Sequence, residues 1–155
     1  MSIPPVPVAI AIGSNLGDRH AHVTWAADAL ARRLTATRLS PIIETAPEGV
    51  PDPQPPYLNA VVWGLCDQAP RQLLDWLLSL EAERFRARTG FRSARTLDLD
   101  LILYGDLAIH EPGLELPHPR FRERRFVLEP LAAIAPDMRD PVTRMTIVEL
   151  LERLK

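Results

Sequence analysis

Residues 97–104 constrain the fold more than any other segment, because leucine alternates with aspartate through its first half. Successive side chains of a β-strand point to opposite faces of the sheet. Asp98 and Asp100 would therefore share one face, and the opposite face would be apolar. The apolar face would be formed by Leu97, Leu99, Leu101 and Leu103. The pattern predicts a central strand with its leucines in a helix-covered core and both carboxylates on the other side.

The remaining segments predict how this strand is framed. Apolar residues at three- and four-residue spacing favour a helix that Asp18 can cap and a second helix that begins at Pro70. Runs of β-forming residues predict further strands, at residues 6–12, 39–45 and 57–66. The order is strand, helix, strand, strand, helix, strand, which is the split βαβ arrangement. We therefore expect an α+β fold of the ferredoxin-like class, an antiparallel sheet with helices on one face, as one domain over residues 1–155.

Other segments are less regular. Residues 47–56 hold five prolines and predict a stiff loop, and we expect this loop and the arginine-rich residues 84–96 to act as lids. Residues 110–125 show no regular pattern, a short helical turn is expected at 126–134, and a helix at 146–154. The tryptophans fit core positions, and they are Trp25, Trp63 and Trp76.

Charge and composition exclude several classes of protein. The 155 residues carry a formal net charge of −2, which argues against a broad nucleic-acid surface. No apolar run reaches the ~18 residues that a membrane span needs, and the proline-rich start lacks the basic region of a signal peptide. The single cysteine, Cys66, excludes an internal disulfide and a cysteine-based zinc site. We expect a cytoplasmic monomer that meets small molecules rather than nucleic acid or membranes.

The basic residues are nearly all arginine, since the only lysine is Lys155. An internal catalytic lysine and a GxxxxGK[ST] phosphate loop are thereby excluded. Two unbalanced groups stand out: Arg84, Arg86, Arg88, Arg92 and Arg95, and then Arg120, Arg122, Arg124 and Arg125. Guanidinium groups fit phosphate oxygens. Although a charge run is often just a solvated surface, these groups around the aspartate strand indicate a polyphosphate with metal.

Asp98 and Asp100 are the candidate metal ligands. Their Cα atoms would lie about 6.5–7 Å apart along a strand. Carboxylates at that spacing repel each other unless a cation or solvent screens them, and Mg²⁺ binds one or two carboxylates together with waters and substrate phosphates. A solvated strand face is the alternative, but the apolar strand and the preceding arginines favour a metal site.

Three further residues have two readings each. Tyr57 and Asn59 share a strand face, where a ring and an amide can bind a flat heterocycle, although an ordinary half-buried strand looks the same. His118 stands between two prolines. It is either structural or a group that donates to a phosphate or stacks on a base.

At this point the chain resembles the 6-hydroxymethyl-7,8-dihydropterin pyrophosphokinase family. The matching stretches are residues 11–16, 57–60, 95–100, 116–118, 126–131 and 134–136. The family has the ferredoxin-like fold and moves pyrophosphate from ATP to the hydroxymethyl group of a reduced pterin, releasing AMP, in folate biosynthesis. The resemblance therefore implies an ATP-dependent diphosphokinase, a transferase, with two Mg²⁺ ions.

The resemblance also implies roles for individual residues. Asp98 and Asp100 would bind the two Mg²⁺ ions, and Arg86 and Arg95 would be the catalytic arginines that clamp the phosphates. The ATP-binding positions would be Glu81, Arg88, Leu101, His118 and Arg124. The pterin-binding positions would be Thr45, Pro47, Tyr57, Asn59 and Phe126, with the two rings on either side of the pterin and the amide at its edge.

Several residues depart from the family pattern and leave alternatives open. Phe85 replaces a glycine before Arg86, and Leu78, Glu115 and Pro119 differ on the adenine side. These differences permit a degenerate member that binds pterin or nucleotide without turnover. A ferredoxin-like RNA- or nucleotide-binding module is a second alternative, but an aromatic content of 6% is low for such a surface.

Overall fold

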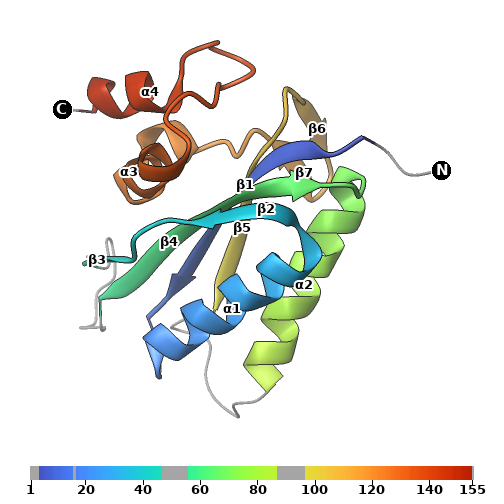
Figure 1. Ribbon diagram of the computed structural model, residues 1–155, viewed down its shortest axis with the longest axis vertical. Coiled ribbons are helices and arrows are strands. Elements are labelled where there is room, and N and C mark those ends of the chain that lie inside the picture. Colours follow the sequence, from blue (N-terminus) through green and yellow to red (C-terminus); the bar gives the residue numbers. More distant parts are fainter. Residues whose placement is uncertain (1–3, 16, 47–55, 87–96, 155) are drawn as a thin grey trace.

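The computed structural model describes residues 4–15, 17–46, 56–86 and 97–154, without the side chains of residues 85 and 86. Its centre is a five-stranded antiparallel sheet with helices on both sides (Figure 1). The strands are β1 (Val6–Ser14), β2 (Thr35–Leu39), β3 (Ile43–Thr45), β4 (Tyr57–Cys66) and β5 (Asp98–Tyr104). The main helices are α1 (Arg19–Arg33) and α2 (Pro70–Arg86). Within the described residues, no helix is both long and apolar enough to cross a membrane.

The strand order confirms the ferredoxin-like class. The order is β2-β4-β1-β5, and β3 pairs with β4 beyond the end of β2. β4 thus lies between β1 and β2, and β1 lies between β4 and β5, so each strand–helix–strand unit is split by a strand of the other. Both units place their helix on the same face of the sheet (Figure 1).

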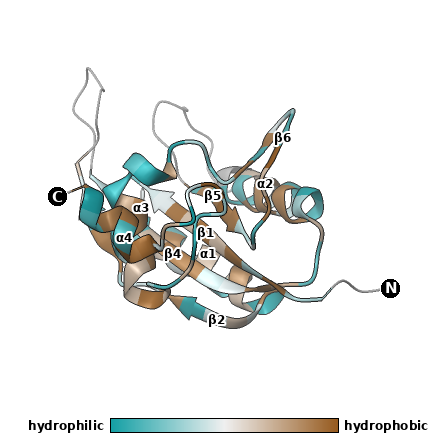
Figure 2. Cartoon of the chain, turned by 90° about the horizontal axis from the view of Figure 1, so that it is seen from above, coloured by the Kyte–Doolittle hydropathy of each residue, from teal (hydrophilic) through white to brown (hydrophobic). Residues whose placement is uncertain are grey.

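That face carries the main core. Asp18 caps α1, its Oδ1 accepting from the Ala21 backbone N at 3.1 Å, as the sequence predicts. Apolar residues meet between the helices and the sheet, among them the fully buried Ile10, Leu30, Leu73 and Leu77. In Figure 2 hydrophobic colouring concentrates where the helices meet the central strands.

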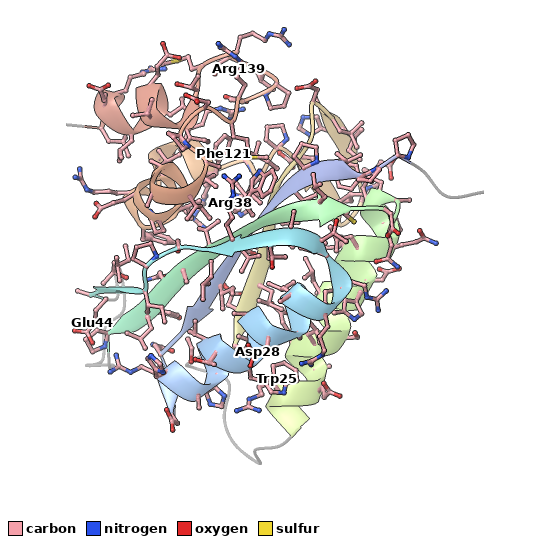
Figure 3. All side chains as sticks on the ribbon, viewed as in Figure 1. Trp25, Asp28, Arg38, Glu44, Phe121 and Arg139 are labelled. Atoms are coloured by element: carbon pink, nitrogen blue, oxygen red, sulfur yellow. The ribbon has the colours of Figure 1, made fainter. Side chains whose placement is uncertain are left out.

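The opposite face is not left entirely to loops and ligands, which corrects the expectation of helices on one face alone. A second core there joins the short η1 helix (Phe121–Glu123), α3 (Arg125–Ile134) and α4 (Ile147–Arg153) to the sheet. Phe121, Leu128 and Leu131 are fully buried in it beside Ala9 and Val61. Arg38 of β2 donates to the Ile134 carbonyl at 3.0 Å, which links β2 to the end of α3. Figure 3 labels Arg38 and Phe121 on the side of the sheet that carries α3. The sheet face beyond these helices stays open.

β5 breaks its own alternation, so the prediction for Leu103 is wrong. Ala9 of β1 pairs with Leu103, but the next residue, Ile10, pairs with Leu101, which leaves Ile102 as an extra residue. This β-bulge shifts the side-chain alternation by one position. Leu97, Leu99 and Leu101 pack under α1 and α2 as expected, whereas Leu103 packs with the α3 side.

Two other segments differ from the prediction. The expected strand at 39–45 is interrupted, since β2 ends at Leu39 and β3 begins at Ile43. The Ser40 Oγ accepts a hydrogen bond from the Val61 backbone N at 2.8 Å and interrupts the ladder before Pro41. Residues 110–125 are more regular than expected. They contain β7 (Leu114–Leu116), which pairs with β6 (Ile109–Glu111) across a turn at Gly113, where φ is 76°.

The tryptophans are half-buried rather than core residues, and each has a guanidinium over its ring. The stacked pairs are Arg84 on Trp25 at 5.1 Å, Arg38 on Trp63 at 4.9 Å and Arg33 on Trp76 at 4.5 Å, each from Cζ to ring centroid. A cation over an indole face is favourable even when partly exposed. These three arginines therefore act in packing, and Arg84 leaves the group that the sequence assigned to phosphate.

A fully buried carboxylate secures the C-terminal part of the fold. Asp140 accepts two hydrogen bonds from Arg122, at 2.5 Å from Nε and 2.9 Å from Nη2. It also accepts from the Thr143 hydroxyl at 2.7 Å and the Val142 backbone N at 3.0 Å. Burial alone would raise the pKa of the Asp140 carboxyl, but the hydrogen bonds led by Arg122 outweigh it and lower the pKa to about 2.

This pKa predicts an acid-sensitive contribution to stability. A carboxyl whose pKa falls from 3.8 to about 2 on folding stabilises the protein at pH values above its unfolded pKa. We expect roughly 2 kcal/mol of the free energy of unfolding to be lost as the pH falls from about 4 towards 2. Urea unfolding across this range measures it. Asp140→Asn should flatten the curve there, and an unchanged acid slope in that variant would contradict the assignment.

Candidate active site

A cleft of about 910 Å³ lies on the open face of the sheet, between β1, β3, β4 and β5 and the η1–α3 segment. The strands form the floor of the cleft. Its wall is formed by η1 and the first turns of α3. Carboxylates, guanidinium groups, two aromatic rings and an amide all line it. They include Asp98, Asp100, Arg120, Arg124, Arg125, Tyr57, Phe126 and Asn59.

The acidic pair lies on the cleft side of β5, as predicted. Asp98 pairs with Gly13 of β1 and Asp100 with Ala11, so the neighbouring strand presents only small residues beside the carboxylates. Both carboxylates are half-buried. The Nη1 of Arg124 lies 3.8 Å from the Asp100 Oδ2, so one of the cleft arginines lies close to the acidic pair.

The donor set fits a hard divalent cation with an incomplete protein shell. Within the described ranges no group of three or more histidine, cysteine, aspartate or glutamate side chains is arranged to hold a metal. Two carboxylates are what Mg²⁺ uses when waters and substrate phosphates supply the rest of its octahedron. Asp98 and Asp100 therefore fit an ion that binds together with a polyphosphate.

Glu81 supports the acidic strand from outside the cleft. Among the described strands β5 is the last of the sheet, so its outer edge faces no further described strand. The Glu81 Oε2 of α2 accepts from the Leu99 backbone N at 2.6 Å, between the two aspartates. This contact ties α2 to the strand that presents the carboxylates. The sequence placed Glu81 on the ATP side, and that role stays a prediction.

The other end of the cleft suits a flat ring. The Asn59 Nδ2 donates to the Thr45 Oγ1 at 2.7 Å, which fixes the orientation of the amide. Its Oδ1 lies toward Gly13, where an added Cβ would stand 3.6 Å from that oxygen and 3.7 Å from the Tyr57 ring. Tyr57 and Phe126 reach the cleft from different elements, β4 and α3. The structure therefore brings together the four described residues that the resemblance assigns to the pterin.

The η1–α3 wall carries the arginines. The Arg124 guanidinium lies 5.5 Å from the Phe126 ring centroid, so one side chain faces both the acidic pair and the aromatic end. Arg125 pairs with Glu129 one helical turn along, at 3.0 Å. Arg122, by contrast, points away to Asp140. The predicted second arginine group thus splits, with Arg122 serving the fold.

His118 lies beside the cleft wall and is held at two points. Its backbone N donates to the Ile102 carbonyl at 2.9 Å, and its Nδ1 accepts from the Arg120 backbone N at 3.1 Å. The neutral ring therefore carries its hydrogen on Nε2. Burial, and next the positive charge of Arg124, lower the pKa of His118. The neutral imidazole is thus favoured, with Nε2–H as a donor.

The remaining predicted residues separate into two groups. Leu101 is 6% exposed and packs in the core under α1 and α2, so its predicted ATP contact finds no support in the cleft geometry. The others lie outside the described residues: Pro47, Arg88, Arg95 and the side chain of Arg86. The two expected lids also fall largely there.

Sequence reasoning missed Arg19. Its Nη1 lies 3.1 Å from the Glu44 Oε2 and 2.7 Å from the Pro56 carbonyl oxygen. It therefore joins the end of β3 to the start of β4 at the rim of the cleft. Nothing in the local pattern around the first turn of α1 marks this role, because it depends on two distant segments.

Together the fold and the cleft define a class of protein: a ferredoxin-like domain whose open sheet face combines an acidic pair, arginines, and two aromatic rings beside an amide. A family model described as 7,8-dihydro-6-hydroxymethylpterin-pyrophosphokinase (HPPK) matches residues 9–136. The chain belongs to this family.

Curated relatives agree with the family match. A "2-amino-4-hydroxy-6-hydroxymethyldihydropteridine pyrophosphokinase" of Pseudomonas aeruginosa is 42% identical over 137 residues, covering 86% of this chain and 83% of that protein. A protein of the same name from Synechocystis is 45% identical over 102 residues, covering 66% of this chain. The match spans about half the length of the Synechocystis protein, 52%.

Solved structures show the same fold. The HPPK-DHPS A437G chain of Plasmodium falciparum superposes with a TM-score of 0.76 at 13% identity, covering 97% of this chain and 45% of that one. At this identity the likeness concerns the fold alone.

Proposed function

We propose that this enzyme transfers pyrophosphate from ATP to the hydroxymethyl group of 6-hydroxymethyl-7,8-dihydropterin and releases AMP, as a step of folate biosynthesis. The observation that carries the proposal is the shared cleft, which is lined by the acidic pair, by Phe126 and by the Asn59 amide. Arg124 lies close to both Asp100 and the Phe126 ring. A polyphosphate and a flat ring are thus held side by side. The described residues give no support to a degenerate member.

The ring-binding end would place the acceptor. The pterin would lie between Tyr57 and Phe126, with its edge on Asn59. The hydrogen bond to Thr45 holds the Asn59 amide in one orientation, so the Asn59 carbonyl and amino groups would face the ring edge in a fixed order. Pro47 completes this pocket in the proposal.

The charged end would place the donor. Arg120, Arg124 and Arg125 line it, and Arg86, Arg88 and Arg95 are proposed as further phosphate contacts, with Arg86 and Arg95 clamping the transferred group. Asp98 and Asp100 would hold two Mg²⁺ ions, which neutralise triphosphate charge when bound. The neutral His118 would offer its Nε2–H to a phosphate oxygen.

Catalysis would then rest on placement. The pterin hydroxyl attacks the β-phosphorus in line and its proton passes to solvent. The bond between the β-phosphorus and the α,β-bridging oxygen breaks, and AMP leaves with the α-phosphate. No described cleft side chain stands out as a general base. Positioning of the two substrates and charge stabilisation in the transition state can supply the acceleration.

We further propose a cytoplasmic monomer that binds no nucleic acid.

A coupled assay of AMP release tests this function. Purified protein with ATP and Mg²⁺ should form AMP only when 6-hydroxymethyl-7,8-dihydropterin is present. AMP formation that ignores the pterin, or none with both substrates, would contradict the proposal.

Asn59→Ala is expected to weaken pterin binding and leave nucleotide affinity near that of the wild type. Lost hydrogen bonds to a buried ring edge should cost on the order of 1–3 kcal/mol. Calorimetric titration with each ligand measures both affinities. Thr45→Val is the matched variant, because it removes the 2.7 Å partner of the Asn59 amide and should reproduce part of the loss. Equal weakening of both ligands by Asn59→Ala would show a general structural effect.

A further inference from the structure

Residues 120–124 divide their side chains between the cleft and the body of the protein. Arg120, Glu123 and Arg124 line the cleft, whereas Phe121 is fully buried and Arg122 points to Asp140. The cleft wall is therefore the outer side of a segment whose inner side is fixed by an apolar and an ionic contact.

The ionic contact is built to be rigid. The Asp140 side chain is fully buried and accepts the four hydrogen bonds described above, two of them from the Arg122 fork. A bidentate guanidinium–carboxylate pair fixes distance and orientation together. Arg122 also lies over the Phe121 ring, with Cζ 4.9 Å from the centroid. Arg122 thus has little freedom to move with respect to residue 140.

The loop that presents Asp140 is itself closed. The Asp140 backbone N donates to the Met145 carbonyl at 2.9 Å, and the Arg144 backbone N donates to the Asp140 carbonyl at 2.8 Å. Thr146 then caps α4 in a capping box with Glu149. The carboxylate therefore stands on a loop anchored by a helix, which packs in the second core.

A short backbone path leads from Arg122 to the cleft. The Arg124 backbone N donates to the Phe121 carbonyl at 3.2 Å, and the Arg124 carbonyl accepts from Val127 and Leu128 at 2.9 and 3.0 Å. Arg124 thus joins η1 to α3, and its guanidinium extends to 3.8 Å from Asp100. Any shift of η1 would move this guanidinium with respect to the acidic pair.

We propose that Asp140 is a positioning residue, which acts through Arg122 to hold η1 where Arg124 can meet the acidic pair and the bound nucleotide. The family match ends at residue 136, so it assigns no role to Asp140. The proposal rests on the proposed function for the identity of the ligand. It adds the Arg122–Asp140 contact to the apparatus that binds nucleotide.

The test is the affinity for α,β-methylene-ATP with Mg²⁺, measured by calorimetry well below the melting temperature of every variant. Arg122→Gln removes the guanidinium fork, and we expect about tenfold weaker binding. Asp140→Asn keeps the shape without the charge and serves as a second variant, with a loss in the same direction. Leu150→Ala is the control. Leu150 lies in α4, is 2% exposed and packs in the same core, so its truncation leaves a cavity there while Arg122 itself is unchanged. It should lower the melting temperature and leave affinity within twofold.

A second background shows whether the effect passes through Arg124. Arg124→Met should weaken binding by itself, and adding Arg122→Gln to it should then cost less than a further twofold. Three results would each overturn the proposal: unchanged affinity in both Arg122→Gln and Asp140→Asn, a full tenfold loss in the Arg124→Met background, or an equal loss in Leu150→Ala. Wild-type protein that binds the analogue but forms no AMP would refute only the proposed function, whereas wild-type protein that binds no analogue would overturn both.

Discussion

Asp98→Asn and Asp100→Asn are each expected to abolish most turnover, by at least a hundredfold, while the fold survives. Both side chains leave the core face of β5 and stand beside Ala11 and Gly13, so a neutral isostere disturbs no packing. Removing one of two neighbouring like charges would even favour the metal-free fold slightly. What is lost is a hard anionic ligand for Mg²⁺ and the placement of the triphosphate that depends on it.

The measurement pairs thermal melting without ligands with AMP formation at saturating Mg²⁺ and ATP. Asp106→Asn is the matched control, since this exposed aspartate follows the far end of β5 and lines no part of the cleft. It should change neither readout. If the Asp98 and Asp100 variants melt normally and keep turnover within about threefold, which is less than ~1 kcal/mol in the barrier, then the two residues are only a solvated strand face.

Phe121→Ala and Phe126→Ala are expected to separate stability from binding. Phe121 is fully buried in the second core, so truncation should cost about 3–5 kcal/mol and lower the melting temperature by roughly 10 °C. Phe126 is half-buried at the cleft, and its loss should cost less stability but remove one wall of the proposed pterin pocket. Differential scanning calorimetry and pterin titration on both variants measure the two effects. Similar melting temperatures, or stronger pterin loss in Phe121→Ala, would contradict the assigned places of the rings.

The parts of the fold that the sequence predicted are those with a strong local period. The helices after Asp18 and Pro70 and the strand at residues 57–66 follow from spacing and caps, and the structure has them with those starts. The order of strands and helices along the chain then left few possible strand orders for the sheet. The bulge at Ile102 could not be predicted, because it arises from the pairing with β1. It falls in a run of apolar residues, where the sequence pattern does not show which side chain faces which side.

The candidate site divides in the same way. Asp98, Asp100, Tyr57 and Asn59 were found because alternation along a strand says which side chains share a face, and the cleft contains all four. The arginines were predicted less well, because a cluster of arginines in the sequence does not show where each side chain points. Arg84 stacks on Trp25 and Arg122 binds Asp140, although both stand in groups that the sequence assigned to phosphate.

Contacts between residues far apart in the sequence explain that failure. The partner of Arg122 is 18 residues away, and the backbone partner of Arg38 is 96 residues away, so no local pattern could reveal either. The same holds for Arg19, which joins the ends of β3 and β4. Sequence reasoning thus identified the strand residues that line the cleft better than the contacts that hold its wall.

Phosphorus NMR of a complete reaction tests the central claim most directly. Protein, Mg²⁺, ATP and 6-hydroxymethyl-7,8-dihydropterin should give AMP and a pterin diphosphate in equal amounts. Two new phosphorus signals should belong to the pterin diphosphate and one to AMP, and none of them should form without the pterin. ADP with a pterin monophosphate would show transfer of one phosphate only. That result would contradict a cleft that directs the pterin hydroxyl to the β-phosphorus.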